Sequence, residues 1–146
     1  MQKQLKLMLL FTVASFILLT GFKRDNLVSS SKARNAGPGS VSITAVFNFS
    51  TFPDVLGTFT ASGALNISGS AEMVIGLNNN GIRGHCIVIL TAPNGTITIH
   101  QQCQFGSNPP KGRWEIVSGT GAYANLKGNG SLLMPPDTEA MEGFIY

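Results

Sequence analysis

The segment Val41–Ser50 reads VSITAVFNFS, and its side chains alternate between apolar and polar. One face of the segment carries five apolar residues: Val41, Ile43, Ala45, Phe47 and Phe49. Only Val46 interrupts the polar face. A period of two residues is typical of a β-strand that is buried on one side. We therefore predict that the folded part of the chain begins at Val41 with a half-buried strand.

The same alternation recurs towards the end of the chain, and turn residues such as Gly, Pro and Asn separate its segments. We predict seven further strands, at 57–64, 71–77, 83–91, 96–105, 113–118, 129–134 and 140–146. No segment after residue 40 has a helical period. Short strands joined mostly by short turns are typical of barrels and sandwiches. The sequence therefore predicts an all-β domain of about eight strands, either a β-barrel or a β-sandwich.

The first 40 residues do not follow this pattern. Lys3 and Lys6 precede an apolar run from Leu7 to Leu19, which is the arrangement of a signal peptide. This run is shorter than the roughly 20 apolar residues that span a membrane. We expect a signal peptide at 1–22, a flexible linker at 23–40 and the β-barrel domain at 41–146. The protein would then be exported, to the periplasm or outside the cell, and would not stay attached to a membrane.

The net charge of +3 belongs to the N-terminal part of the chain. Residues 1–40 contain six Lys or Arg and one Asp, whereas residues 41–146 contain four Lys or Arg and six Asp or Glu. The predicted barrel domain is therefore slightly acidic and shows no basic stripe in its sequence. Since nucleic-acid binding depends on a basic surface, we expect no nucleic-acid partner.

The segment Trp114–Gly128, WEIVSGTGAYANLKG, contains the spacing of a dinucleotide-binding loop. Residues Gly119–Ala124 match the pattern G-x-G-x-x-A. That motif requires a long helix and a parallel crossover after the second glycine, but Gly128 follows too soon for such a helix. We therefore interpret the motif as a compact connection between strands, with Tyr123 and Leu126 packed against the sheet. No cofactor is expected.

The stretch Gly112–Leu132, GRWEIVSGTGAYANLKGNGSL, resembles secreted bacterial proteins with an allene oxide cyclase-like barrel. Dirigent proteins have a related segment, G-G-T-G-x-F, at the corresponding turn. The stretch Leu56–Leu65, LGTFTASGAL, is similar to a Gly-Thr-Phe-Thr strand near the start of the same bacterial proteins. The resemblance implies an eight-stranded antiparallel barrel with a mostly apolar interior. It implies no catalytic residue, because no active-site motif of the cyclases or dirigent proteins is matched position by position.

Cys86 and Cys103 lie in the two predicted strands that flank the turn at residues 92–95. If residues 94 and 95 form a two-residue turn, Cys86 faces Cys103 closely enough for a disulfide. An oxidising compartment would favour that bond. If residues 93–95 form a three-residue loop, His85 faces Cys103 as a candidate nucleophile pair, and Cys86 points to the opposite face. The sequence leaves both turns open.

The rest of the predicted barrel offers few groups for chemistry. His85 and His100 are the only histidines, and no spacing typical of a metal site or of a nucleophile elbow occurs. We expect no metal and no catalytic residue. Gln101 shares the predicted inner face with apolar residues, so it is a candidate for orienting a ligand. Near a barrel mouth it would contact water instead.

The sequence therefore favours an exported, non-enzymatic barrel that binds a small apolar ligand or acts as a surface component. The alternative is a cyclase-like or dirigent-like isomerase that acts on a lipid or phenolic intermediate by confining it in the barrel. A second copy of the chain is a further candidate partner.

Overall fold

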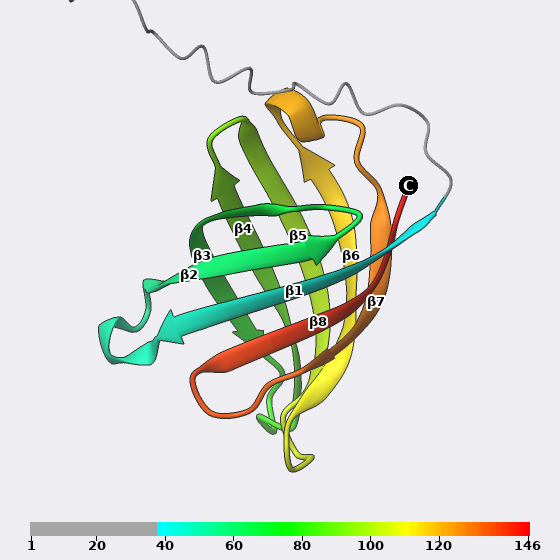
Figure 1. The fold of residues 1–146 in the computed structure, drawn as a ribbon. Coiled ribbons are helices and arrows are strands. Elements are labelled where there is room, and N and C mark those ends of the chain that lie inside the picture. Colours follow the sequence, from blue (N-terminus) through cyan, green and yellow to red (C-terminus); the bar gives the residue numbers. More distant parts are fainter. Residues whose placement is uncertain (1–37) are drawn as a thin grey trace, which may run out of the picture. The chain divides into compact units, whose positions relative to one another are not determined.

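The computed structural model describes residues 38–146, whose eight strands form one closed antiparallel barrel (Figure 1). The strands are β1 Gly39–Asn48, β2 Val55–Gly63, β3 Ile67–Leu77, β4 Arg83–Ala92, β5 Gly95–Gln104, β6 Lys111–Gly119, β7 Gly128–Leu133 and β8 Thr138–Ile145. Each strand pairs with the next, and β1 pairs with β8 to close the barrel. The predicted all-β class and the eight-stranded barrel are confirmed, and the sandwich alternative is wrong.

The predicted signal peptide at 1–22 and most of the predicted linker at 23–40 lie outside the described residues. β1 begins at Gly39, two residues before the first strand that the sequence predicts. Between residues 38 and 146 the helical segments are two short 3₁₀ turns, η1 Phe49–Thr51 and η2 Gly121–Tyr123. No helix in this range is long and apolar enough to cross a membrane.

The apolar alternation of the strands places one set of side chains inside the barrel. In β1, Val41, Ile43, Ala45 and Phe47 are buried, whereas the residues between them face outwards. Phe49, which the sequence places on the same face, lies in η1 instead and is 43% exposed. The predicted strands thus build the barrel interior, although β3 begins at Ile67, four residues before its predicted start.

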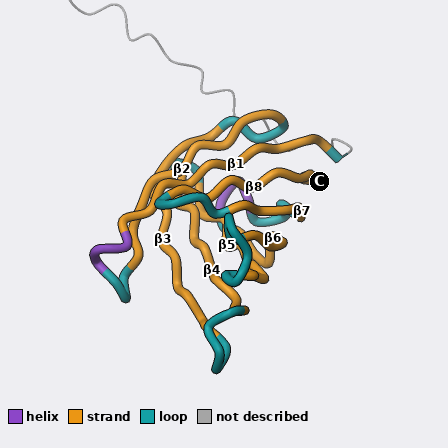
Figure 2. The backbone as a smooth tube through the Cα atoms, turned by 90° about the horizontal axis from the view of Figure 1, so that it is seen from below, coloured by secondary structure: helices purple, strands orange, loops and turns teal. Residues whose placement is uncertain are grey.

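The connections of the barrel are divided between its two ends. Loops 49–54, 78–82, 105–110 and 134–137 lie at one end, which we call the mouth (Figure 2). The β4–β5 turn and the longer β6–β7 connection lie at the other end, towards the top of Figure 1.

The β6–β7 connection packs closely against the β4–β5 turn. Gly121 has φ +58°, and a Cβ there would overlap the carbonyl oxygen of Asn94. The backbone N–H of Ala122 donates to the same oxygen at 2.9 Å, and Tyr123 is buried. This segment therefore forms the compact connection between antiparallel strands that the sequence predicts, and Gly121 provides a conformation that side chains rarely adopt.

Trp114 of β6 reaches across the neighbouring strand to pack against Gly143 of β8. It pairs with Gly130 of β7, which in turn pairs with Gly143 of β8. A Cβ at Gly143 would lie 2.7 Å from Cζ2 of the indole, too close for real atoms. The indole N–H donates to the carbonyl oxygen of Glu142 at 3.3 Å. The absence of a side chain at Gly143 therefore leaves room for the Trp114 indole.

Candidate functional site

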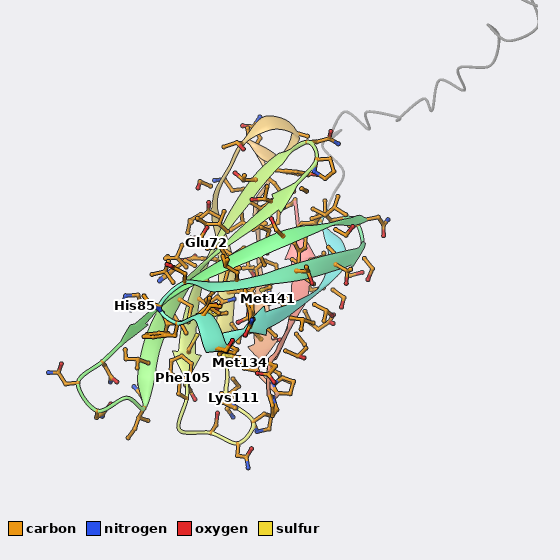
Figure 3. All side chains as sticks on the ribbon, turned by 90° about the vertical axis from the view of Figure 1, so that its left-hand side faces the viewer. Glu72, His85, Phe105, Lys111, Met134 and Met141 are labelled. Atoms are coloured by element: carbon orange, nitrogen blue, oxygen red, sulfur yellow. The ribbon has the colours of Figure 1, made fainter. Side chains whose placement is uncertain are left out.

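A cavity of about 250 Å³ lies at the mouth of the barrel. Most of its lining side chains are apolar and come from β1, β3, β4 and the loops of the mouth: Phe47, Phe49, Met73, Ile75, Cys86, Phe105, Pro110, Met134, Pro135 and Pro136. Asp137, Thr138 and Glu139 complete the lining. Figure 3 shows Phe105 and Met134 towards this end and Met141 further inside. The cavity is therefore an apolar space with a few polar groups on one side.

Glu139 is the buried acid of this cavity. It lies on the inner face of β8 together with Met141 and Ile145, and it is 1% exposed. Neither of its carboxyl oxygens has a hydrogen-bond partner among the described residues. Burial raises the pKa of Glu139 from 4.5 to about 7, and the neighbouring Gln101 amide opposes part of this shift. The carboxyl group therefore changes its protonation state close to neutral pH.

Gln101 of β5 lies deeper in the barrel, next to Met141. It is fully buried, so the alternative in which it contacts water near the barrel mouth is wrong. Its Nε2 donates to Sδ of Met141 at 3.5 Å, whereas its Oε1 has no partner among residues 38–146. Gln101 does not line the mouth cavity itself. Its amide and the Glu139 carboxyl are the two buried polar side chains of the barrel interior.

The β4–β5 turn differs from both turns that the sequence predicts. Residues 93 and 94 form the turn, and Ala92 pairs with Gly95. Pro93 suits the first turn position because its φ is fixed and it has no N–H to donate to a sheet. Gly95 has φ +143°, and a Cβ there would overlap the carbonyl oxygen of Thr120. Packing against the β6–β7 connection therefore keeps Gly95 at the start of β5.

The observed register also changes the predicted cysteine pairing. Cys86 is opposite Gln101 and Cys103 is opposite Gly84, so the two cysteines do not face each other directly. Both nevertheless point into the barrel as free thiols, with their Sγ atoms 3.6 Å apart. The hydrogen bond between the thiols, together with burial, raises the pKa of Cys86 far above its usual range. Cys86 is therefore an uncharged thiol and a poor nucleophile.

The alternative His85–Cys103 pair does not form. His85 is opposite Gln102 and lies on the exposed outer face of β4, whereas Cys103 is buried. The prediction is wrong because it assumed a three-residue loop, which would shift the pairing by one residue and reverse the face of every side chain on one strand.

No group of three or more His, Cys, Asp or Glu side chains within the described barrel could hold a metal ion. Glu139 was not expected as a site residue, because the last strand was predicted to begin at Ala140. Extending the alternation of Ile145 and Met141 by two residues reaches Glu139 and would have placed an acid on an apolar face.

Comparison with protein-family models, with curated proteins and with solved structures finds no significant match for this chain. The resemblance to allene oxide cyclase-like barrels therefore stays an expectation from the sequence.

Proposed function

We propose that the protein binds a small, mainly apolar molecule in the mouth cavity and is not an enzyme. One observation carries this proposal: Glu139 is buried in the wall of an apolar cavity and neither of its oxygens meets a protein partner in residues 38–146. A buried polar group without a hydrogen bond costs about 1–3 kcal/mol. A fold that keeps such a group next to a cavity is best explained by a ligand that satisfies it.

The unpartnered atoms also define the polar end of the ligand. When Glu139 is ionised, both of its carboxyl oxygens, which line the cavity, are hydrogen-bond acceptors. A hydroxyl or an amine supplies the missing donor, whereas a carboxylate would repel Glu139. The volume of about 250 Å³ is just below the usual range of roughly 300–1,000 Å³ for ligand pockets, so the ligand is small.

Three six-carbon probes test this proposal by titration calorimetry at pH 8, where Glu139 is mostly ionised. We expect hexylamine to bind more tightly than 1-hexanol, and hexanoate to bind least. Glu139→Gln should retain the binding of hexanol and lose the preference for the amine. If hexanoate binds wild-type protein as tightly as hexylamine, the assignment of Glu139 as the polar anchor is wrong.

A pair of neighbouring residues on β3 provides a control for the location of the site. Ile75 lines the cavity, whereas Val74 is 57% exposed on the outer face. Ile75→Trp should block the cavity and abolish hexanol binding, and Val74→Trp should leave it unchanged. Equal hexanol binding by both variants would show that the probe occupies another place.

The second candidate function is an isomerase that confines a lipid or phenolic intermediate. The observation that favours it is the pKa of Glu139, about 7, because a general acid or base works best when its pKa lies near the operating pH. Such an enzyme would give one stereoisomer in excess from a cyclisation that is otherwise racemic. Its rate should change with an inflection near pH 7 in the wild type and not in Glu139→Gln. A racemic product at every pH would exclude this function.

A further inference from the structure

The outer face of β4, β5 and β6 brings together basic residues that are distant in the sequence. The strand register places Arg83, Gln104 and Lys111 in one row across the three strands. His85, Gln102 and Arg113 form the next row. Residues two apart on a strand share a face, so both rows point away from the barrel interior. We call these six residues the basic face; Figure 3 labels two of them, His85 and Lys111.

The basic face concentrates most of the positive charge of the barrel. Of the four Lys and Arg residues between 41 and 146, only Lys127 lies elsewhere. The barrel domain as a whole is slightly acidic, so this concentration is local. The His100 ring adds one further polar group beside His85, with the two ring centroids 6.0 Å apart.

The cations of the basic face have no acidic partners. Within residues 38–146, one contact between a basic and an acidic side chain is short enough for an ion pair: His100 Nδ1 lies 3.4 Å from Glu115 Oε1, one row further along the strands. Arg83, Lys111 and Arg113 therefore have no carboxylate within ion-pair distance in the described barrel. Their charges are available to an external anion.

These residues line an open groove of about 840 Å³ on the barrel wall. Neighbouring strands are about 4.8 Å apart, so Arg83 and Lys111 start from backbone positions roughly 10 Å apart. Lys111 and Arg113 are separated by about 7 Å along β6. Charges distributed in this way suit a chain with repeated anionic groups better than a single small anion.

The other residues of the groove define the chemistry of that chain. The amides of Gln102, Gln104 and Asn78 can both donate to and accept from hydroxyl groups. No aromatic ring other than the two imidazoles lines the groove, so nucleic-acid bases lack the usual stacking platform. Leu77 is its one exposed apolar side chain, too little for insertion into a lipid surface.

We propose that the basic face is a binding site for a linear polysaccharide that carries sulfate or carboxylate groups. The three cations pair with the anionic groups and the glutamine amides bind the hydroxyls between them. This site is on the outside of the barrel wall and is independent of the mouth cavity.

The test measures binding of the full chain to dextran sulfate over a range of NaCl concentrations. Arg83→Gln, Lys111→Gln and Arg113→Gln each remove one charge from the basic face, and Lys127→Gln removes one charge from elsewhere on the barrel. Each Lys or Arg that pairs with the polyanion releases counterions, so log K falls as log salt rises. Each substitution in the basic face should make this negative slope shallower by a little under one. Lys127→Gln should leave the slope unchanged.

Several outcomes would overturn the proposal. If Lys127→Gln makes the slope shallower by as much as the other variants do, binding depends on net charge and not on this site. Uncharged dextran should not bind, so dextran binding that equals that of dextran sulfate would exclude an anion site. Tighter binding to polyglutamate, to single-stranded DNA or to phosphatidylglycerol vesicles at equal anion concentration would assign the basic face to a peptide, nucleic acid or membrane instead.

Discussion

The Sγ atoms of Cys86 and Cys103 lie 3.6 Å apart inside the barrel, although neither cysteine is opposite the other in the sheet. They meet across a diagonal between β4 and β5, because both side chains point inwards from positions that are offset by two residues. Diagonal neighbours have Cα atoms about 7–8 Å apart, slightly beyond the usual range for a disulfide. A bond between these sulfurs would therefore require a local adjustment of the two strands.

Refolding of the unfolded chain in oxidised glutathione, where both thiols are accessible, should join them in a disulfide by exchange, with release of two molecules of reduced glutathione. The bond would close a loop between residues 17 apart, for which chain entropy gives about 3 kcal/mol. The distortion of the sheet and the constraint that a hairpin already imposes on the unfolded chain reduce this gain, so we expect about 1–2 kcal/mol. Thermal unfolding before and after addition of reductant measures the difference. A variant with Cys86→Ala and Cys103→Ala should be unaffected by either reagent, and two titratable thiols in the unfolded, oxidant-treated protein would contradict the prediction.

The stability of the barrel should depend on pH through Glu139. The folded state raises the pKa of this carboxyl from 4.5 to about 7, so the folded protein binds the proton more tightly than the unfolded chain. Stability is therefore fully retained below about pH 4.5 and is lost as the pH rises towards 7, by about 3 kcal/mol in total. Glu139→Gln removes this contribution. The difference in unfolding free energy between variant and wild type should grow from pH 4.5 to 7 and then stay constant; parallel pH curves for the two proteins would show that Glu139 is not buried as described.

Gly143→Ala should destabilise the barrel by about 3 kcal/mol, because the new methyl group would meet both the Trp114 indole and the backbone of β7. Ser131→Ala is the control, since Ser131 is exposed on the paired strand β7. Chemical denaturation of the two variants measures the effect. If both variants unfold at the wild-type midpoint, the indole does not lie above Gly143.

Gly121→Val should cost about 1–3 kcal/mol, since valine is strained at φ +58° and its Cβ would overlap the carbonyl oxygen of Asn94. Ala122→Val places the same side chain on the next, exposed residue of η2 and should cost much less. Calorimetry should detect no saturable binding of NAD or ATP by the wild type. Nucleotide binding that Gly121→Val abolishes would restore the dinucleotide-binding interpretation of this segment.

Alternation of side chains was sufficient to predict the strands because it depends only on which face of a strand is buried. The turn at Pro93 and Asn94 could not be predicted in the same way. It depends on the contact of Gly95 with Thr120, and nothing local in the sequence reports that contact. One residue of error at this turn changed the partner of each cysteine.

Some features of the candidate sites could be predicted from a single strand, whereas others depend on strands that pair across a long distance in the sequence. The inward direction of Gln101 was predictable from its own strand, but its depth in the barrel was not, and the inward direction of Glu139 was within reach of the same reasoning. The basic face was not, because Arg83, Lys111 and Arg113 become neighbours only through the pairing of three strands. The absence of a basic stripe in the sequence therefore did not exclude a basic surface on the barrel.

The pairing of β1 with β8 has a consequence for the order in which the chain can fold. Closure joins residues about a hundred positions apart, such as Ser42 and Glu142. Until residues 138–145 are available, β1 and β7 both remain open sheet edges, which are templates for association with other chains. Contacts of such long range also slow folding. A chain that is synthesised from its N-terminus can therefore assemble seven strands and still be prone to aggregation. The sheet edges become protected only when the last strand is in place.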